Sequence, residues 1–434
     1  MTTPAAPLRW DTTLPDGRHA TLLLRAAAFN LLLNDEAPSF TFDLSGRLYG
    51  AFLDGINYRR SLDNRMLAKW SLPENGSTQR QRRWLAEAEA LSLIETVQRL
   101  VRGLVAASQA APPRVQRALQ RLAAWDWPAL EADRRRFNRL YSPIGILPPD
   151  QYLAVVAQAT AGCSHNACTF CTLYQDIPFR IKPPEEFRSH LAGVAQFFGP
   201  ALAMRHSLFL ADANALVVPM PRLLALLDIL KETTKQGYEP DRERAAQSVG
   251  TARDDDSAPT RLPTLGELPW FAFIDAFHVE RKSLADWQEL RARGLQRVYI
   301  GMESGHDPLL RWLNKPGDAA DVLDAVQTLK AAGLQASVIL MLGVGGAAYA
   351  EGHVRDSAAL LNAMPLGKGD LIYLSDFVEQ PTAAYVAQAA AAGIQPLPAS
   401  ACRSQEQALR SLFTAADAGQ PPQFAHYALA DFVY

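Results

Sequence analysis

Three of the four cysteines of this chain fall within ten residues, in the stretch GCSHNACTFC at positions 162–171. Four residues separate Cys163 from Cys168, and two more separate Cys168 from Cys171. Thiolates spaced this closely on one loop suit an iron–sulfur cluster, because each can bind a different iron of one cubane. The fourth cysteine, Cys402, lies far along the chain. The residues therefore predict a 4Fe-4S cluster whose fourth iron stays open to a small-molecule ligand.

A structural zinc site is the main alternative for the same loop. His165 lies between the first two cysteines and would complete a Cys3His tetrahedron with the three thiolates. One short loop would then supply all four ligands, whereas structural zinc sites usually combine two separate loops. A third interpretation makes one cysteine a nucleophile, but a catalytic thiol does not need two companions at fixed spacing. We favour the cluster, and a non-catalytic zinc-binding module with a basic nucleic-acid-binding region stays open as the second hypothesis.

The composition is that of a soluble globular protein. Of the 434 residues, 48% are apolar and 20% are charged, and the length suggests two or three folded units. The first residues do not read as a signal peptide, and no apolar run is long enough to predict a membrane span. Four cysteines are too few for a disulfide framework in a chain of this size. We expect a cytoplasmic protein whose net charge of −2 gives no general attraction to polyanions.

The elements that position the cysteine loop begin with an N-terminal α+β domain, residues 1–141. Residues 8–70 hold β-rich runs, and Ser45-Gly46 predicts a hairpin between SFTFDL and RLYGAFL. From Ser77 the apolar residues recur at helical spacing. The sequence therefore predicts arginine-rich helices over 77–140, the first one capped by Ser77 or Thr78.

The proline-rich stretch 142–150 predicts the boundary to a second domain over 142–380, which is followed by a helical extension over 381–434. In the second domain strand-like runs alternate with helical stretches, and this predicts a parallel βα architecture. Residues 236–266 are polar and without period, so we interpret them as a long flexible insertion. The cysteine loop follows the first strand, at the strand edge that holds the active site in such folds. The six predicted strands are 152–159, 207–211, 271–279, 297–302, 336–343 and 371–375.

Four motifs occur in order along this domain: GCSHNACTFCTLYQDIPFR (162–180), FLADANALVVP (209–219), GLQRVYIGMESGHDPLLRWLNKPG (294–317) and SVILMLGVGG (337–346). Together they resemble the radical S-adenosylmethionine (radical SAM) superfamily, and specifically a subgroup with a GCSHNxCTFCxMY loop followed by a Phe-Arg pair. The four-then-two cysteine spacing departs from the superfamily's commonest spacing of three then two. The resemblance covers roughly residues 145–380. It implies a partial (βα)6 TIM-like barrel with a 4Fe-4S cluster and SAM as cofactors.

The resemblance also implies roles at individual positions. The three cysteines would hold the cluster, SAM would chelate the open iron through its amino and carboxylate groups, and Phe170 would flank the adenine. Asp212 and Asn214 occupy the place where the superfamily meets the methionyl amino group, although the usual Gly-Gly-Glu pattern is absent. The remaining implied contacts to SAM are Glu303, Ser304, Gly343 and Gly345.

Each of these has an ordinary structural explanation. Ser304 or Asp307 could simply start the helix DPLLRWLN, and the glycines are also what a tight turn needs. Candidates for contacting the substrate are Asp275 and His278 after the third strand and Asp376 after the sixth. Strand-end position is their only support, and helix capping or pairing with Arg281 or Lys282 explains them as well.

The resemblance does not name a reaction, because this superfamily uses one 5′-deoxyadenosyl radical for many outcomes. We see no second cysteine cluster, and no Asp-x-His-x-x-Gly cobalamin signature in the first 140 residues, so neither auxiliary clusters nor cobalamin is expected. The substrate is predicted to be a small metabolite or an RNA base. Between positions 80 and 139 twelve arginines accompany six acidic residues, which could bind RNA but more ordinarily mark a solvated helix face. An external electron donor of the flavodoxin or ferredoxin type is implied, and Cys402 is expected to be a small core residue.

Overall fold

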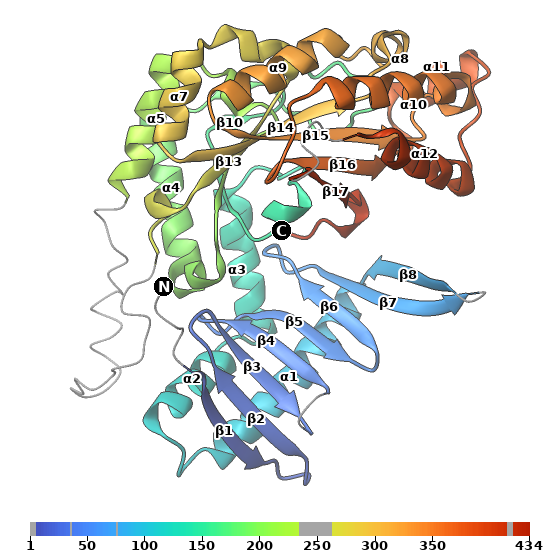
Figure 1. The fold of residues 1–434 in the computed structure, drawn as a ribbon. Coiled ribbons are helices and arrows are strands. Elements are labelled where there is room, and N and C mark those ends of the chain that lie inside the picture. Colours follow the sequence, from blue (N-terminus) through green and yellow to red (C-terminus); the bar gives the residue numbers. More distant parts are fainter. Residues whose placement is uncertain (1–5, 35–36, 75–76, 234–262, 415–419) are drawn as a thin grey trace.

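The structure is a computed structural model that describes residues 6–34, 37–74, 77–233, 263–414 and 420–434. Figure 1 shows two units: an antiparallel sheet with its helices, and above it a parallel sheet surrounded by helices. Of the insertion predicted at 236–266, residues 236–262 lie outside the described part of the chain. Its last residues enter a short 3-10 helix at Leu265–Glu267. No helix in the described ranges is both long and apolar enough to cross a membrane.

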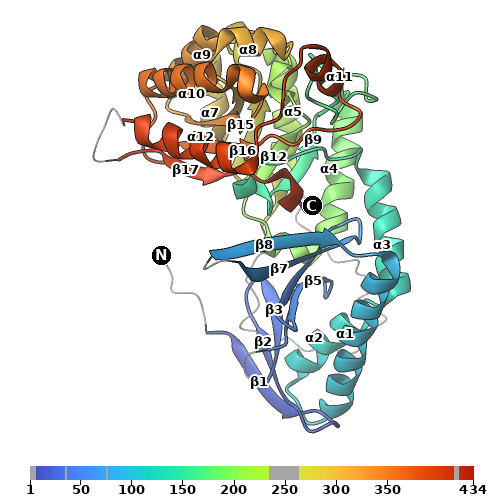
Figure 2. The ribbon, with the colours of Figure 1, turned by 90° about the vertical axis from the view of Figure 1, so that its right-hand side faces the viewer.

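The N-terminal unit is an eight-stranded meander in which each strand pairs with the next. Its inner face is apolar because residues alternate along each strand: Leu22, Leu31 and Phe40 are neighbours on three adjacent strands and are all buried. Two helices, α1 (Glu87–Ala107) and α2 (Pro113–Ala123), cover one side of the sheet (Figure 2). The strands are β1 Leu8–Thr13, β2 His19–Leu24, β3 Ala28–Leu33, β4 Ser39–Asp43, β5 Leu48–Leu53, β6 Ile56–Arg60, β7 Met66–Glu74 and β8 Ser77–Trp84.

The hairpin predicted at Ser45-Gly46 is confirmed as the β4–β5 turn, but the predicted start of the first helix is wrong. Residues 77–84 form β8, which pairs with β7 along its whole length, and α1 begins only at Glu87. The stretch STQRQRRW offers no apolar stripe that would hold a helix on the core, whereas the edge of β7 offers a complete row of backbone partners. The interior of α1 follows the predicted period, with Ile94, Val97, Val101 and Leu104 buried.

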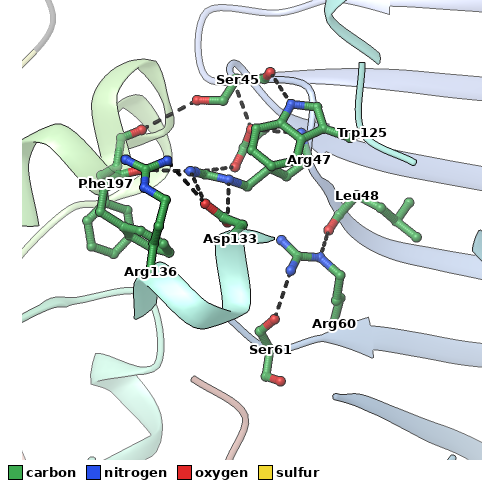
Figure 3. Close-up of polar contacts among 11 residues, drawn as sticks. Ser45, Arg47, Leu48, Arg60, Ser61, Trp125, Asp133, Arg136 and Phe197 are labelled. Carbon is green, nitrogen blue, oxygen red and sulfur yellow. Dashed lines mark hydrogen bonds and ion pairs between the residues drawn. The ribbon is translucent and has the colours of Figure 1, made fainter. Parts of the chain in front are cut away.

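The two units meet through a buried arginine (Figure 3). Arg47, in the turn before β5, donates to the backbone carbonyl of Phe197 (2.7 Å) on α4 (Pro184–Phe198). The same guanidinium pairs with Asp133 (2.9 Å) on α3 (Trp127–Leu140) and lies over the ring of Trp125. Arg47 and Asp133 are both almost completely buried. Side chains of both units therefore meet at one point away from water.

The second unit is built on seven parallel strands whose spatial order follows the chain. Because all strands run the same way, the loops after them emerge at one edge of the sheet. The connecting helices lie along the outside of the strands (Figure 1). The strands are β9 Val155–Gln158, β12 Leu208–Ala211, β13 Trp270–Ile274, β14 Leu295–Glu303, β15 Gln335–Leu342, β16 Leu371–Asp376 and β17 Gln423–His426. The further helices are α5 Met220–Glu232, α7 Leu284–Ala292, α8 Asp307–Trp312, α9 Ala319–Ala331, α10 Gly346–Ala363, α11 Ala384–Ala391 and α12 Ala399–Leu412.

All six predicted strands are present, with two differences around them. The third strand ends at Ile274, because the N–H of Asp275 bonds to the Asn214 side chain (3.1 Å) instead of a neighbouring strand, and the chain then forms a 3-10 helix at Ala276–Arg281. The extension predicted as helical contains α11 and α12 but also β17, which joins the sheet parallel to β16. The two edge strands of this sheet are β9 and β17.

Candidate active site

The cysteine loop leaves the sheet after β9 and is closed at its base by a short antiparallel pair, Thr160–Ala161 with Arg180–Ile181. Gly162 has φ +73°, and a Cβ there would collide with the carbonyl of Ile177, so the loop can only begin with glycine. Asn166 also takes a left-handed conformation, and its side chain donates to the carbonyl of Tyr174 (2.8 Å). This turn accommodates the longer first gap between the cysteines.

The turn after α8 holds the loop from one side. Asn314 Nδ2 donates to the carbonyl of Ala167 (2.8 Å), and the Asn314 carbonyl accepts from His165 Nε2 (2.9 Å). The N–H of Thr169 donates to the carbonyl of Leu313 (2.9 Å). On the other side, the Thr169 carbonyl accepts from the N–H of Tyr385 at the start of α11. Segments far apart in sequence therefore fix the loop at both ends.

The three cysteines line one cavity of about 390 Å³ at the C-terminal edge of the strands. It combines thiols, carboxylates and one ammonium group with a largely apolar wall. Phe170, Asp275, Glu303 and Asp376 from the sequence prediction also line it. The apolar lining includes Phe273, Ile274, Ile339, Met341, Phe377 and Tyr427. The sequence-predicted cluster ligands and several predicted contact residues thus share one space.

The three thiols are half-buried and form no disulfide. Burial raises the pKa of the Cys168 thiol to about 12, and Lys315 acts against this shift. Burial also raises the pKa of Cys171. Within the described residues, no group of three or more His, Cys, Asp or Glu side chains is arranged to hold a metal ion. His165 uses Nε2 to bond the carbonyl of Asn314 and so holds the loop against the turn after α8. Cluster ligands each bind a different iron, so their sulfurs do not have to converge on one ion.

Sequence reasoning missed Lys315, the cation of the site. Its ammonium nitrogen lies 3.3 Å from Glu303 and 3.5 Å from Asp275, and all three side chains are largely buried. Burial alone would lower the pKa of Lys315, but the two carboxylates outweigh it and raise that pKa above its usual value. Burial raises the pKa of Glu303, and Lys315 opposes this. The stretch NKPG after α8 could have indicated Lys315, because α8 follows the end of β14 and a lysine in the turn after it can reach back to the strand ends.

Glu303 needs an unusual backbone to make this contact. It ends β14 with φ +59°, a conformation that costs energy for a residue with a side chain. Its carboxylate folds back over Gly301, where a Cβ would collide with Glu303 Oε1 and come within 3.1 Å of the Lys315 nitrogen. The glycine therefore provides the space in which the Glu303–Lys315 pair forms.

Asp275 is connected to the cysteine loop through Asn214. Asn214 Nδ2 donates to Asp275 (2.6 Å) and to Ser164 Oγ (2.8 Å), next to Cys163. His278 is buried behind this pair, 3.8 Å from Asp275, and does not line the cavity. Burial lowers the pKa of His278 to about 4, so it is a neutral packing group in this arrangement. Asn214 and His278 both contact Asp275, and neither of them lines the cavity itself.

Asp212 lies beside the cavity without lining it. Its carboxyl is buried, Oδ1 accepts a long bond from Gln158 (3.5 Å), and the backbone N–H of Gly162 acts against the raised pKa of the carboxyl. Oδ2 has no hydrogen-bond partner in the described part of the chain. Burial raises the pKa of Asp212 to about 7. The carboxyl therefore has an unsatisfied oxygen close to the first residues of the cysteine loop.

The structure does not bring Ser304 or the glycines after β15 into the cavity. Ser304 is fully buried, and its hydroxyl bonds to His353 Nδ1 (2.8 Å) and accepts from the N–H of His306. A Cβ on Gly343 would meet the Cys402 sulfur at 2.8 Å, and the Gly343 and Gly345 N–H groups already donate to Gln405 and Tyr385. The chain's own side chains thus fill the space over these glycines: Cys402 on α12 over Gly343, and Leu309 and Tyr349 over Gly345. Cys402 is half-buried there and packs against the core.

Asp376 lines the cavity from the end of β16. Its side chain is 56% exposed and pairs with His426 Nε2 (3.2 Å) on β17. Three exposed apolar residues, Leu173, Val378 and Leu429, line the same cavity and mark where it opens to solvent. Asp376 therefore stands nearer to this opening than the buried group around Lys315.

No family model matches the chain, and no curated protein matches it in sequence. The structure is similar to the cobalamin-dependent S-adenosylmethionine radical enzyme OxsB (TM-score 0.36, 12% identity, 79% of this chain and 36% of that one). It is similar to the radical SAM enzyme HemN, coproporphyrinogen III oxidase from Escherichia coli (0.39, 13%, 62% and 53%). It is also similar to the radical S-adenosylmethionine methyltransferase TsrM from Kitasatospora setae (0.33, 16%, 54% and 40%). The chain spans little more than half of HemN and less of the other two, and the function proposed below rests on the site itself.

Proposed function

We propose that the chain is a radical SAM enzyme in which Cys163, Cys168 and Cys171 hold a 4Fe-4S cluster next to bound SAM. One observation carries the proposal: three cysteines of a single loop line one cavity at the C-terminal edge of a parallel βα sheet. On this proposal the sheet is a partial TIM-like barrel with one strand more than the (βα)6 core that the sequence predicts. When bound, the cluster and SAM would supply a 5′-deoxyadenosyl radical that removes a hydrogen atom from the substrate.

The residues present fit these groups in size and chemistry. A cavity of about 390 Å³ lies within the range of small-molecule sites. Thiols whose pKa is raised by burial stay protonated at neutral pH until a metal displaces the proton, so metal binding at Cys168 and Cys171 is coupled to proton release. The flanking Phe170 offers an apolar surface suited to an adenine ring.

Lys315 and its two carboxylates supply the polar contacts of the proposal. An ammonium group has three donors, and Glu303 and Asp275 account for two of them. The third can reach a ligand carboxylate such as that of SAM, while the excess of carboxylates favours a ligand that also carries positive charge. The unsatisfied Oδ2 of Asp212 would suit the SAM amino group only once it is uncovered, because it lies buried beside the cavity. Contact between these residues and SAM is the part of the proposal that mutation must test.

The substrate is proposed to enter at Asp376, where the cavity opens between exposed apolar residues. As the sequence predicts, it is a small molecule or an RNA base, and an external flavodoxin- or ferredoxin-type protein delivers the electron. Some arginines of the N-terminal unit pair with carboxylates within the chain: Arg83 pairs with Glu89 and Arg82 with Asp431. This occupation favours a small molecule over RNA.

The test is anaerobic reconstitution with iron and sulfide, then incubation with SAM and dithionite and detection of 5′-deoxyadenosine by mass spectrometry. We expect about four irons and four sulfides per chain. The Cys168→Ala variant should lose cluster and product together. Cys402→Ala is the matched control, because Cys402 packs against Gly343 and does not line the cavity. It should keep both.

Metal analysis separates the proposal from its rival. One zinc per chain, no colour and no 5′-deoxyadenosine would support a structural zinc module and overturn the enzyme. If an intact cluster forms but SAM survives, repeating the reaction with cell extract supplies the missing substrate. SAM that survives even then would contradict the open iron position.

A further inference from the structure

Arginines cluster at the junction between the N-terminal sheet and the βα unit, away from the cysteine cavity. Arg47 has two carboxylate partners there, Asp43 and Asp133, the second of which is labelled in Figure 3. Three more arginines, Arg59, Arg60 and Arg205, lie close by, and in the described part of the chain none of them pairs with a carboxylate. Only 6% of Arg60 and 8% of Arg205 is exposed to solvent. Asp43 acts on Arg60 and Arg205 through space without pairing with either of them. The positive charges therefore outnumber the negative ones in this partly buried place.

Neutral groups satisfy only part of these guanidinium groups. Arg60 donates to the carbonyls of Leu48 (2.6 Å) and Ser61 (3.1 Å). Arg205 makes one long bond to the carbonyl of Ala154 (3.4 Å) and lies over the ring of Phe198. Arg59 lies over the ring of Tyr49, 3.3 Å from its centroid. The Nε atoms of Arg59 and Arg205 and the hydroxyl of Tyr152 are buried and have no hydrogen-bond partner in the described residues.

All three of these unsatisfied donors belong to residues that line one enclosed cavity, as does Arg60. Asp43 is the one carboxylate among the lining residues, and it already accepts from the N–H groups of Ser45 and Arg47. The cavity holds about 20 Å³, enough for a single particle of roughly the size of water. Its walls come from both units, with Arg59 and Arg60 on β6 and Arg205 after α4.

The excess of positive charge favours an anion at this place. An arginine keeps its positive charge in a protein, and burying that charge without a partner is unfavourable. Burial and the positive charges of Arg205 and Arg60 lower the pKa of Arg59 to about 9. The lowered pKa reflects the same unfavourable burial of positive charge. Water would satisfy the donors but would leave the three charges to repel one another. A monovalent anion satisfies both needs in the space available.

We propose that a small anion of the size of chloride binds between Arg59, Arg60 and Arg205 and holds the N-terminal sheet to the βα unit. The site is specific for small anions, because the cavity has no room for phosphate or sulfate. Binding couples the stability of the whole chain to the chloride concentration.

Bromide is the direct probe, since it replaces chloride and scatters anomalously. Crystals of the full chain soaked in sodium bromide are expected to show an anomalous peak within bonding distance of Arg59 and Arg205. Adding two residues after Tyr434, which also lines the cavity, should leave that peak in place. No peak in the unaltered chain would overturn the proposal, and a peak that appears only after this extension would assign the negative charge of the unaltered chain to its own carboxylate.

Thermal unfolding gives the solution test. At constant ionic strength, replacing sodium gluconate by sodium chloride should raise the unfolding temperature in a saturable way. The Arg205→Met variant should lose this dependence, and the milder Tyr152→Phe variant should bind chloride roughly tenfold more weakly. Arg136→Met is the matched control, because Arg136 is an arginine of the same junction that does not line the cavity. Equal unfolding temperatures in chloride and gluconate would refute the site. The site would also be refuted if the Arg136→Met variant lost the stabilisation by chloride while the Tyr152→Phe variant kept it in full.

Discussion

At the residue scale, the sequence predicted the ligands that are neighbours in the chain and missed the cation that tertiary structure adds. Cys163, Cys168 and Cys171 could be found because nine residues contain all of them. Lys315 could not, because its partners lie at the ends of two different strands, Asp275 just after β13 and Glu303 at the end of β14, and only the sheet brings them together. The prediction for Ser304 failed for the opposite reason. It ends a strand as expected, but its hydroxyl bonds to His353 on α10 instead of facing the cavity.

Gly301 gives a specific test of the Lys315 group. In a Gly301→Ala variant the new methyl group would collide with the Glu303 carboxylate, and relieving such overpacking typically costs about 1–3 kcal/mol. If that strain displaces Glu303 from the ligand, production of 5′-deoxyadenosine should fall roughly tenfold or more. The cysteines are untouched, so the iron content should not change. Steady-state kinetics with varied SAM, together with iron analysis, measures both effects.

Gly367→Ala is the control for that experiment, because a Cβ there meets only one atom, at an ordinary contact distance of 3.4 Å. It should behave like the unaltered chain. If Gly301→Ala kept full activity, the Glu303–Lys315 pair would have no part in binding or catalysis. Loss of iron from Gly301→Ala would instead show that the pair supports the cysteine loop.

At the element scale, the sequence located the parallel strands well because each is a compact apolar run followed by a helical pattern. It failed for β8 and β17, whose sequences STQRQRRW and QFAH carry no apolar period. Both are held as strands by a neighbour, β7 in one case and β16 in the other. Such strands form because the edge of a neighbouring strand supplies backbone hydrogen-bond partners, and a local sequence pattern does not show that edge.

The N-terminal edge of the βα sheet offers a second prediction. Asp150, before β9, accepts hydrogen bonds from the hydroxyls of Tyr299 (2.6 Å) and Tyr373 (2.7 Å) and pairs with Arg297 (2.7 Å). The shared carboxylate joins β14 and β16 at the end opposite the active site. Asp150→Ala would leave the hydroxyls of Tyr299 and Tyr373 without this acceptor and remove the ion pair of Arg297, so the free energy of unfolding should fall by about 2–4 kcal/mol.

Urea unfolding followed by tryptophan fluorescence measures this loss. The comparison is Glu232→Ala, which breaks the exposed pair with Arg188 and should cost less than about 1 kcal/mol. Equal effects of the two substitutions would mean that the shared carboxylate contributes no more than an ordinary surface charge. Because Asp150 lies at the opposite end from the cysteines, cluster content should be unchanged in the folded fraction.

At the scale of the whole molecule, buried histidines predict how stability depends on pH. Burial lowers the pKa of His190 from 6.5 to about 3 and that of His353 to about 4. Between these values and 6.5 the unfolded chain binds protons that the folded chain does not, so stability is constant above about pH 6.5 and falls as the pH is lowered. Each histidine should account for about 2 kcal/mol between pH 6.5 and pH 5.

Urea unfolding at several pH values tests this, with His190→Gln as the comparison. The variant should show a shallower loss of stability on acidification, because its side chain takes up no proton. The raised pKa of Asp212 acts in the opposite direction but is common to both proteins, so it cancels in their difference. Parallel pH profiles for the two proteins would contradict the assignment to His190.

The contact between the two units provides the last prediction, and it depends on the geometry in Figure 3. Arg47 is the only partner of Asp133 in the described residues that is itself buried; the other, Arg136, is 44% exposed. Arg47→Leu should therefore reduce the free energy of unfolding by about 3–5 kcal/mol, mostly because Asp133 stays charged and buried. Combining it with Asp133→Leu removes that charge, so the double variant should be more stable than Arg47→Leu alone. If the two losses simply added in a double-mutant cycle, the pair would not be coupled, and the apolar contacts around it would hold the two units together.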